Sequence, residues 1–410
     1  MRRGVLAGFL VLGSVIPLAA EASYSVEATV RIYGETAHSR DSLAVVDEDK
    51  RDTWESGSAG EILARHRVIS EGTLFFADHG IFYFPAPRSW SGAGTGGTGA
   101  ENPARAELTH ELYQAFLRTT LAPGVELTAG RQRLWEEGNP AGLFFSVTDG
   151  LHPRGALRER SPGFDGAELR FGDGSRGILS AGLAFQDAFD DTQGTDTPWR
   201  LVRAALTAER RVGKSAGKSG GKSAGEERRM GGTVVMQRDT MVRPGLYATL
   251  AGDRLRGGTE LALEWYNPHR QEWQPRFLAG VSGGIREDLP GGGYLELTGE
   301  YHYNGLALNH TGTEVPFPVT SDGAGAFLRP GEHYLHMRFL LEGSSRWRSE
   351  HRLTRNLDDQ SMLVEQEILF LGMAPFEAGA EIIWTSGAAD SEFGAFQEDL
   401  VLRLFAGVRL

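Results

Sequence analysis

The C-terminal segment Leu400–Leu410, with the sequence LVLRLFAGVRL, alternates between two kinds of side chain. Leucine, alanine and valine occupy every even-numbered position, whereas Arg403, Gly407 and Arg409 fall on odd-numbered ones. A period of two residues is that of a β-strand, whose successive side chains point to opposite faces of a sheet. The segment is therefore predicted to be a strand with one wholly apolar face.

The same alternation recurs along the chain. Near the N-terminus, residues 24–33 place tyrosine, valine, alanine and isoleucine on one face and serine, glutamate, threonine and arginine on the other. Similar alternation occurs at 261–265, 295–303, 335–341 and 376–384, and weaker candidates are 347–356, which alternates poorly, and the short segment 233–237. Strands of about 9–11 residues are long enough to cross a bilayer at a tilt. These segments therefore predict a chain built almost wholly of membrane-crossing strands.

The connections between the predicted strands differ in length. Long polar stretches are expected at 35–60, 80–104, 134–164, 187–198 and 305–331. Short Gly/Pro/Ser turns are expected at 70–72, 122–124, 172–175, 252–258, 288–292 and 343–345. Long connections at one end and short turns at the other are typical of outer-membrane barrels. We therefore predict an all-β fold, a closed antiparallel transmembrane β-barrel of about 18 strands, with 16 as the alternative.

Two segments stand apart from the barrel pattern. Residues 213–232 contain a low-complexity Lys/Ser/Gly run and are predicted to be a flexible basic linker at the short-turn end. Residues 1–22 begin with Arg2 and Arg3, continue with an apolar run and end in Ala-Glu-Ala, as a cleaved secretory signal peptide does. Residues 23–410 are then expected to form the barrel.

Composition excludes several function classes. The 410-residue chain has no cysteine, so it has no disulfide scaffold, thiol nucleophile or Cys-ligated metal site. Its formal net charge of −12 argues against a nucleic-acid partner, which requires a basic surface. The motif Gly280-Val281-Ser282-Gly283-Gly284 has the spelling of a hydrolase nucleophile elbow, but no helix pattern follows it. No catalytic residues, metal ligands or cofactors are therefore predicted.

One region resembles a known family. The segments 129–138 (AGRQRLWEEG), 148–153 (TDGLHP) and 162–170 (PGFDGAELR) resemble Gram-negative outer-membrane porin-like barrels, among them alginate-export-type porins. In that pattern a Gly-Arg-Gln strand end leads into a Trp/Gly loop with a Thr-Asp pair. The chain departs from it at Glu136-Glu137, which follow the tryptophan, and at Leu410, where outer-membrane proteins usually end in an aromatic residue.

The resemblance implies that the loop 134–164 folds inward and narrows the pore. It suggests Arg131, Arg133, Trp135 and Asp149 as constriction residues. Strand parity leaves two positions open for Arg131, because its alternate neighbours are apolar. Either this side chain lies at the outer rim, or Gly130 marks a bulge that turns it inward.

Parity also assigns charged side chains to the interior of the barrel. The predicted pore-lining residues are Glu260, Glu264, Glu296, Glu300, Arg338, Glu377 and Glu381. Rings of carboxylates favour cations and rings of arginine favour anions, so the abundance of glutamate leans towards cations. Opposite charges on neighbouring strands can instead simply pair and stiffen the wall.

Together these patterns predict a passive channel in the bacterial outer membrane, with no enzymatic activity. Its expected partners are membrane lipids, small hydrophilic solutes and, through the C-terminal strand, the outer-membrane insertion machinery. Three alternatives remain open at this stage: a barrel hydrolase with Ser282 as nucleophile, a plugged barrel that serves as an adhesin, and a secreted β protein outside the membrane.

Overall fold

The structure is a computed structural model. It describes residues 23–39, 53–70, 72–84, 107–132, 164–172, 177–185, 202–213, 227–237, 241–266, 273–305, 332–343, 346–373, 375–388, 391, 393 and 398–410. The predicted signal peptide lies outside these residues. Nearly all of the described residues are in β-strands and none is helical. Within that part of the chain, no helix is long and apolar enough to cross a membrane.

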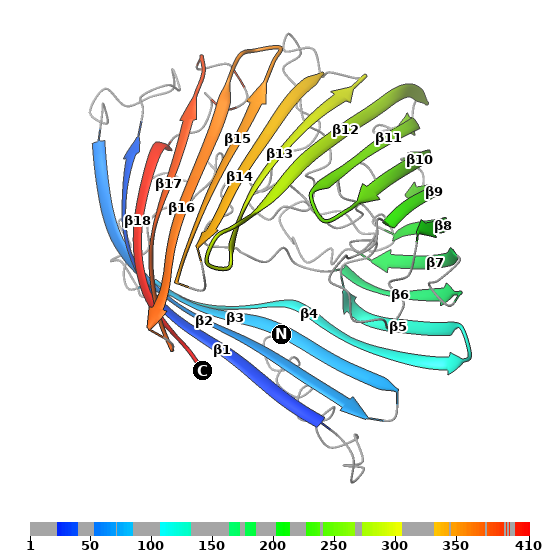
Figure 1. The fold of residues 1–410 in the computed structure, drawn as a ribbon, viewed down its shortest axis with the longest axis horizontal. Coiled ribbons are helices and arrows are strands. Elements are labelled where there is room, and N and C mark those ends of the chain that lie inside the picture. Colours follow the sequence, from blue (N-terminus) through cyan, green and yellow to red (C-terminus); the bar gives the residue numbers. More distant parts are fainter. Residues whose placement is uncertain are drawn as a thin grey trace, which may run out of the picture.

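Eighteen strands follow one another along the chain (Figure 1). The first nine are β1 (Ser23–Ser39), β2 (Thr53–Ser70), β3 (Thr73–Phe84), β4 (Glu107–Ala122), β5 (Val125–Gln132), β6 (Phe164–Phe171), β7 (Gly177–Phe185), β8 (Val202–Gly213) and β9 (Glu227–Gln237). The others are β10 (Met241–Ala251), β11 (Leu255–Tyr266), β12 (Gln274–Leu289), β13 (Gly293–Asn304), β14 (His333–Gly343), β15 (Trp347–Asn356), β16 (Met362–Met373), β17 (Phe376–Ser386) and β18 (Glu398–Arg409). The predicted strand number is confirmed.

The sheet closes on itself. Each strand pairs antiparallel with the next one in sequence, and β18 pairs with β1 from Thr29↔Arg409 to Ser39↔Glu398. A closed sheet has no edge strand with unpaired backbone groups. The C-terminal segment that first indicated the fold is thus the strand that completes the barrel.

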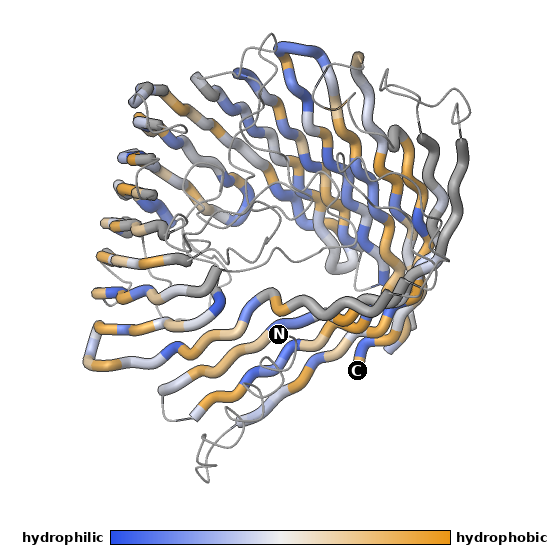
Figure 2. Tube along the Cα trace, turned by 180° about the vertical axis from the view of Figure 1, so that it is seen from behind, coloured by the Kyte–Doolittle hydropathy of each residue, from blue (hydrophilic) through white to orange (hydrophobic). Residues whose placement is uncertain are grey.

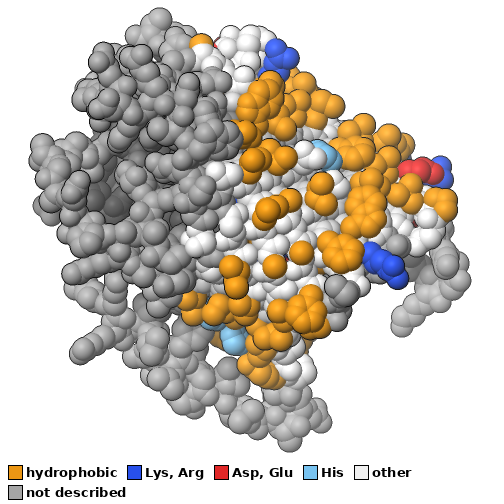
Figure 3. Space-filling view, turned by 90° about the vertical axis from the view of Figure 1, so that its left-hand side faces the viewer, with side chains coloured by type: hydrophobic (Ala, Val, Ile, Leu, Met, Phe, Trp, Pro, Cys, Tyr) orange, Lys and Arg blue, Asp and Glu red, His pale blue; other side chains and the backbone are white. Residues whose placement is uncertain are grey.

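The two faces of the wall differ in polarity. Ile32, Leu246 and Leu404 point outward and are 68%, 66% and 67% exposed, whereas the inward Tyr33 is 4% exposed. Colouring by hydropathy shows the resulting alternation along most strands (Figure 2). On the side of the exterior drawn in Figure 3, hydrophobic side chains are spread over the described surface and charged ones are few. The predicted apolar face of β18 is therefore the outer face of the barrel.

The connections largely follow the predicted pattern. At one end, which we call the short-turn end, tight turns join β2 to β3 and β4 to β5, and Gly72 and Gly124 adopt positive φ there. At the opposite end most connections are long, but those at 238–240 and 357–361 are short. The prediction that residues 213–232 form a linker is wrong from Glu227 onward, because β9 begins there. Gly231 and Gly232 interrupt the hydrophobic period of that strand and conceal it in the sequence.

The neighbourhood of Arg131 resolves the question of a bulge. The register of β5 with β4 and with β6 continues through Gly130, so β5 has no bulge at this glycine. A register shift lies instead in β4, where Asp78 pairs with Gln114 and the next residue of β3 pairs with Leu112. Gly130 has φ of 121°, a conformation that residues with a side chain rarely adopt.

A substitution at Gly130 tests this local strain. A Cβ there would overlap the carbonyl oxygen of Ala115 and lie 2.9 Å from Phe116 Cα. We expect Gly130→Ala to lower the free energy of unfolding by about 2 kcal/mol, combining the cost of positive φ with the clash. Urea titration of the barrel refolded in detergent measures this. Gly283→Ala is the control, because its Cβ would meet no atom within 4 Å, and an equal loss in both variants would contradict the prediction.

Candidate functional site

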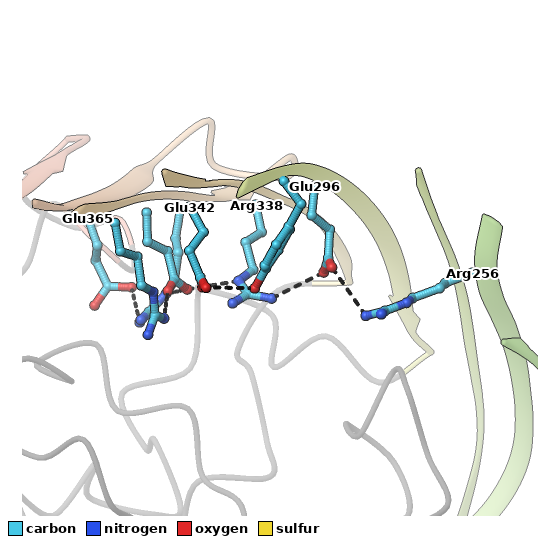
Figure 4. Close-up of polar contacts among 9 residues, drawn as sticks. Arg256, Glu296, Arg338, Glu342 and Glu365 are labelled. Atoms are coloured by element: carbon cyan, nitrogen blue, oxygen red, sulfur yellow. Dashed lines mark hydrogen bonds and ion pairs between the residues drawn. The ribbon is translucent and has the colours of Figure 1, made fainter. Parts of the chain in front are cut away.

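A row of charged side chains crosses the inner wall from β11 to β16 (Figure 4). Its members come from β11, β13, β14, β15 and β16, and they point away from the strands into the interior (Figure 4). We call it the inner charge row, and it consists of Arg256, Glu296, Arg338, Arg348, Glu350, Arg352 and Glu365. Antiparallel pairing produces the row, because inward positions of adjacent strands lie directly opposite one another.

Glu350 is the centre of the inner charge row. Its Oε1 accepts hydrogen bonds from Nε of Arg338 and from Nε of Arg352, each at 2.8 Å. Its Oε2 accepts a further bond from Arg348. The Glu350 side chain is 4% exposed, so it is a nearly buried carboxylate shared by three guanidinium groups. Such charge-assisted hydrogen bonds are stronger than neutral ones.

The row continues on both sides of this centre. Towards β11, Glu296 accepts hydrogen bonds from Nη1 of Arg256 at 3.2 Å and from Nη1 of Arg338 at 3.5 Å. Towards β16, Nη1 of Arg352 donates to Glu365 Oε2 at 3.5 Å. The carboxylates and guanidinium groups therefore alternate around this part of the wall, and each arginine of the row has an acidic partner.

The two kinds of charge lie at different depths. Arg256, Arg338 and Arg352 are 47%, 38% and 45% exposed, whereas their partners Glu296 and Glu350 are 9% and 4% exposed. Arginine has the longer side chain, so its guanidinium extends further from the wall than the carboxylate behind it. In this row the guanidinium groups are consequently more exposed than the carboxylates, although the sequence contains more acidic than basic residues.

A second charged cluster lies where the barrel closes. Glu377 on β17 accepts hydrogen bonds from Arg31 on β1 and, at 2.5 Å, from Arg409 on β18. Nearby, Nη1 of Arg403 donates to Glu381 Oε2 at 3.0 Å. These pairs join the first strand to the last two from the inside. The side chain of Glu377 is fully buried. The main effect of the cluster is therefore to connect the ends of the sheet, and Glu377 contributes little to the lining of the interior.

The remaining predicted glutamates lie on β11 and β13. Glu260 and Glu264 point inward but are 1% and 0% exposed, and Glu264 is paired with Arg243 of β10. Glu300 accepts a hydrogen bond from Nε2 of His302 at 3.2 Å when that nitrogen is protonated. Burial therefore leaves Glu260 and Glu264 almost inaccessible from the interior, whereas the inward-facing side chain of Glu300 is 21% exposed.

The predicted constriction residues fall mostly outside the described part of the chain. Arg133, Trp135 and Asp149 lie there, as does the loop between β5 and β6. Arg131 is described, and the register places it on the outer face, next to the last residue of β5. Its Nη1 donates to the backbone carbonyl of Leu112 at 3.3 Å. Of the two positions that the sequence allowed, this is the outer rim.

Sequence reasoning missed part of the inner charge row. Arg348, Glu350 and Arg352 on β15 are absent from the predicted site because this segment shows little hydrophobic alternation. Its outward face also carries polar residues, Ser349 and His351, so both faces look polar in the sequence. A search for charge at every second position, rather than for hydrophobicity, would have found the three residues.

The hydrolase alternative lacks its expected local geometry. Ser282 lies within β12, paired with Gly258 and Glu300, rather than on a strand-to-helix turn. Among the described residues its buried Oγ has no hydrogen-bond partner, so no histidine is in place to activate it.

Glu332, His333 and Asp358 gather at one end of β14, where one potential ligand atom of each residue lies within 4.8 Å of the others. Asp358 there accepts hydrogen bonds from backbone N–H groups of the other two residues.

Comparison with solved structures identifies the class of fold. OccK9 (OpdG) of Pseudomonas aeruginosa aligns with a TM-score of 0.56 and 12% identity, covering 95% of this chain and 98% of that one. OccAB3 of Acinetobacter baumannii aligns with a TM-score of 0.54 and 11% identity, covering 96% and 100%. A BenF-like porin from Pseudomonas fluorescens gives 0.52 and 11%, covering 95% and 98%.

The similarity is one of structure alone. No family model matches the chain, and no curated protein matches its sequence. At these identities the chain shares only its fold with the solved structures: its eighteen-strand barrel aligns with them over almost the full length of both chains. The finer sequence resemblance, to alginate-export-type porins, remains a prediction.

The central role of Glu350 can be tested by removing its charge. Glu350→Gln keeps the volume but leaves Arg338, Arg348 and Arg352 without their shared carboxylate. We expect the free energy of unfolding to fall by about 1–3 kcal/mol, less than for a fully buried pair because the arginines are partly solvated. Urea unfolding in detergent measures it. Glu342→Gln is the control, because it removes the charge of a carboxylate that accepts a hydrogen bond from Tyr294, and a similar loss of stability there would argue against a central role for Glu350.

Proposed function

We propose that this protein is an outer-membrane porin-like channel for the passive diffusion of small hydrophilic solutes. The observation that carries the proposal is the contrast between the two faces of one closed sheet. The outer face exposes large apolar residues all around the barrel, and the inner face carries solvent-accessible arginines. The fold shared with solved porins supports this function over that of an enzyme or a secreted β protein.

The proposal places the barrel in the outer membrane of a Gram-negative bacterium. A closed barrel satisfies every ladder hydrogen bond within the sheet, which hydrocarbon requires. Residues 1–22 would direct the chain across the inner membrane and then be removed. The apolar outward face of β18 would be the part that the insertion machinery recognises. Membrane lipids are then the permanent partners of the outer face.

Selectivity would arise from the inner charge row. A solute that enters the interior exchanges part of its hydration for contacts with polar side chains of the wall. Because the guanidinium groups project past their carboxylate partners, an anionic group is favoured over a cationic one of equal size. This reverses the weak cation preference that the glutamate count suggested. The loop 134–164, which contains Trp135 and Asp149, would add a constriction together with Arg133 just before it.

An arginine on the outer face tests the membrane assignment. Leu404→Arg places a charge near the middle of β18, and we expect it to lower stability in lipid by about 2–4 kcal/mol. Leu410→Arg, on the same face at the strand end, should cost only about 0–1 kcal/mol. Refolding into phospholipid vesicles with urea titration measures both. Equal costs, or a wild-type protein that never enters the vesicles, would rule out a lipid-facing exterior.

Planar-bilayer recording tests the channel and its selectivity together. We expect the wild-type protein to conduct, with a reversal potential in a KCl gradient that indicates anion preference. The triple variant Arg256→Gln, Arg338→Gln, Arg352→Gln should shift the permeability ratio severalfold towards cations. Arg254→Gln, in the turn before β11, serves as the control and should shift it little. Absence of conductance would indicate a plugged barrel, and an unshifted ratio would exclude the inner charge row as the selectivity element.

A further inference from the structure

Two histidines interrupt the apolar outer face. His66 lies on β2 and His79 on the adjacent strand β3, and both are half-buried. In the register of these strands, His66 faces Ala77 and His79 faces Ala64, so the histidines form a diagonal cross-strand pair. Diagonal partners on one face of a sheet are within reach of long side chains. The two small alanines leave the imidazoles space to meet.

The imidazoles approach each other through one nitrogen each. Nε2 of His66 lies 3.2 Å from Nε2 of His79, and the rings are within 8° of parallel with centroids 5.4 Å apart. The opposite nitrogen of His66, Nδ1, lies 3.3 Å from the hydroxyl of Tyr24 on β1. Three adjacent strands, β1, β2 and β3, thus contribute to this outward cluster, and β1 is also the strand that pairs with β18 to close the barrel.

We propose that His66 and His79 bind a divalent transition-metal ion, with Zn²⁺ as the best fit. Two nitrogens on one tetrahedral zinc, each about 2.0–2.1 Å from the ion, are separated by about 3.3 Å. The observed separation of 3.2 Å matches this value. The terminal torsion of histidine is soft, so small ring rotations direct both lone pairs to one ion. Imidazole is a preferred ligand for zinc, copper and nickel.

Tyr24 fits the role of an orienting partner. A histidine that binds metal through Nε2 carries its proton on Nδ1 and usually donates it to an oxygen. The Tyr24 hydroxyl is in place to accept that hydrogen bond from His66 and so fixes the tautomer that binds metal. Tyr24 is the second residue of β1 and 64% exposed, close to the short-turn end. Water or lipid headgroup oxygens at this border would complete the coordination.

The inference is independent of channel activity. The bound ion would join β2 to β3 beside the closing strand β1, and its effect would be structural. Glu332, His333 and Asp358 form a second group that could hold a metal ion, which we call the alternative cluster. It lies at the start of β14, so the experiment must distinguish the two sites.

Zinc titration of the full-length barrel tests the site. The protein, purified in detergent without a polyhistidine tag, is titrated with ZnCl₂ by calorimetry, and Co²⁺ absorption reports the coordination geometry. We expect one equivalent of zinc to bind. We also expect bound zinc to raise the temperature at which the barrel unfolds, seen as the shift from the folded to the unfolded band position on a denaturing gel. His66→Ala and His79→Ala should each abolish both effects, and Tyr24→Phe should weaken binding by about tenfold.

Matched variants make the outcome decisive. His351→Ala removes another outward-facing histidine on β15, and His333→Ala removes the histidine of the alternative cluster; both should bind zinc as the wild type does. Because an alanine variant can fold poorly, His66→Gln provides a second version with similar volume. Loss of binding in His333→Ala alone would move the site to the alternative cluster. No zinc binding by the wild type would overturn the proposal.

Discussion

Closure of the sheet is the constraint on which the rest of this structure depends. The pairing of β18 with β1 leaves no strand with an open edge, so every strand has a partner on both sides. Once the sheet is closed, alternate residues must point either into the interior or away from it. The separation of an apolar exterior from a charged interior follows directly.

The interior charges show how closure distributes polar groups. Antiparallel register brings inward residues of neighbouring strands together, and the chain uses this to alternate arginine with glutamate from β11 to β16. The resulting ion pairs offset part of the cost of placing carboxylates against the wall. Their unequal depth gives a near-neutral wall a surface of exposed guanidinium groups. Charge balance and charge exposure are therefore different properties of this protein.

The outer face follows a different rule, because it has few polar residues. His66 and His79 are exceptions that contact each other and Tyr24, rather than isolated substitutions. Arg131 is another exception, and its position at the end of β5 accounts for it. Polar residues on an apolar exterior are costly in lipid, least so near its borders. Polar residues on this face are therefore expected in contacting pairs or at strand ends, where the cost is lowest.

The sequence alone determined the fold class, the strand number and which face of β18 is apolar, because strand periodicity and turn residues are local signals. It also identified Glu296 and Arg338 as inward-facing. It did not reveal Glu350, whose strand has two polar faces, nor the start of β9, which Gly231 and Gly232 conceal. Only the tertiary structure decided the register that assembles the inner charge row, the burial of Glu260 and Glu264, and the meeting of His66 with His79. These depend on how strands distant in sequence align, and side-chain length and burial then set which charge reaches the interior.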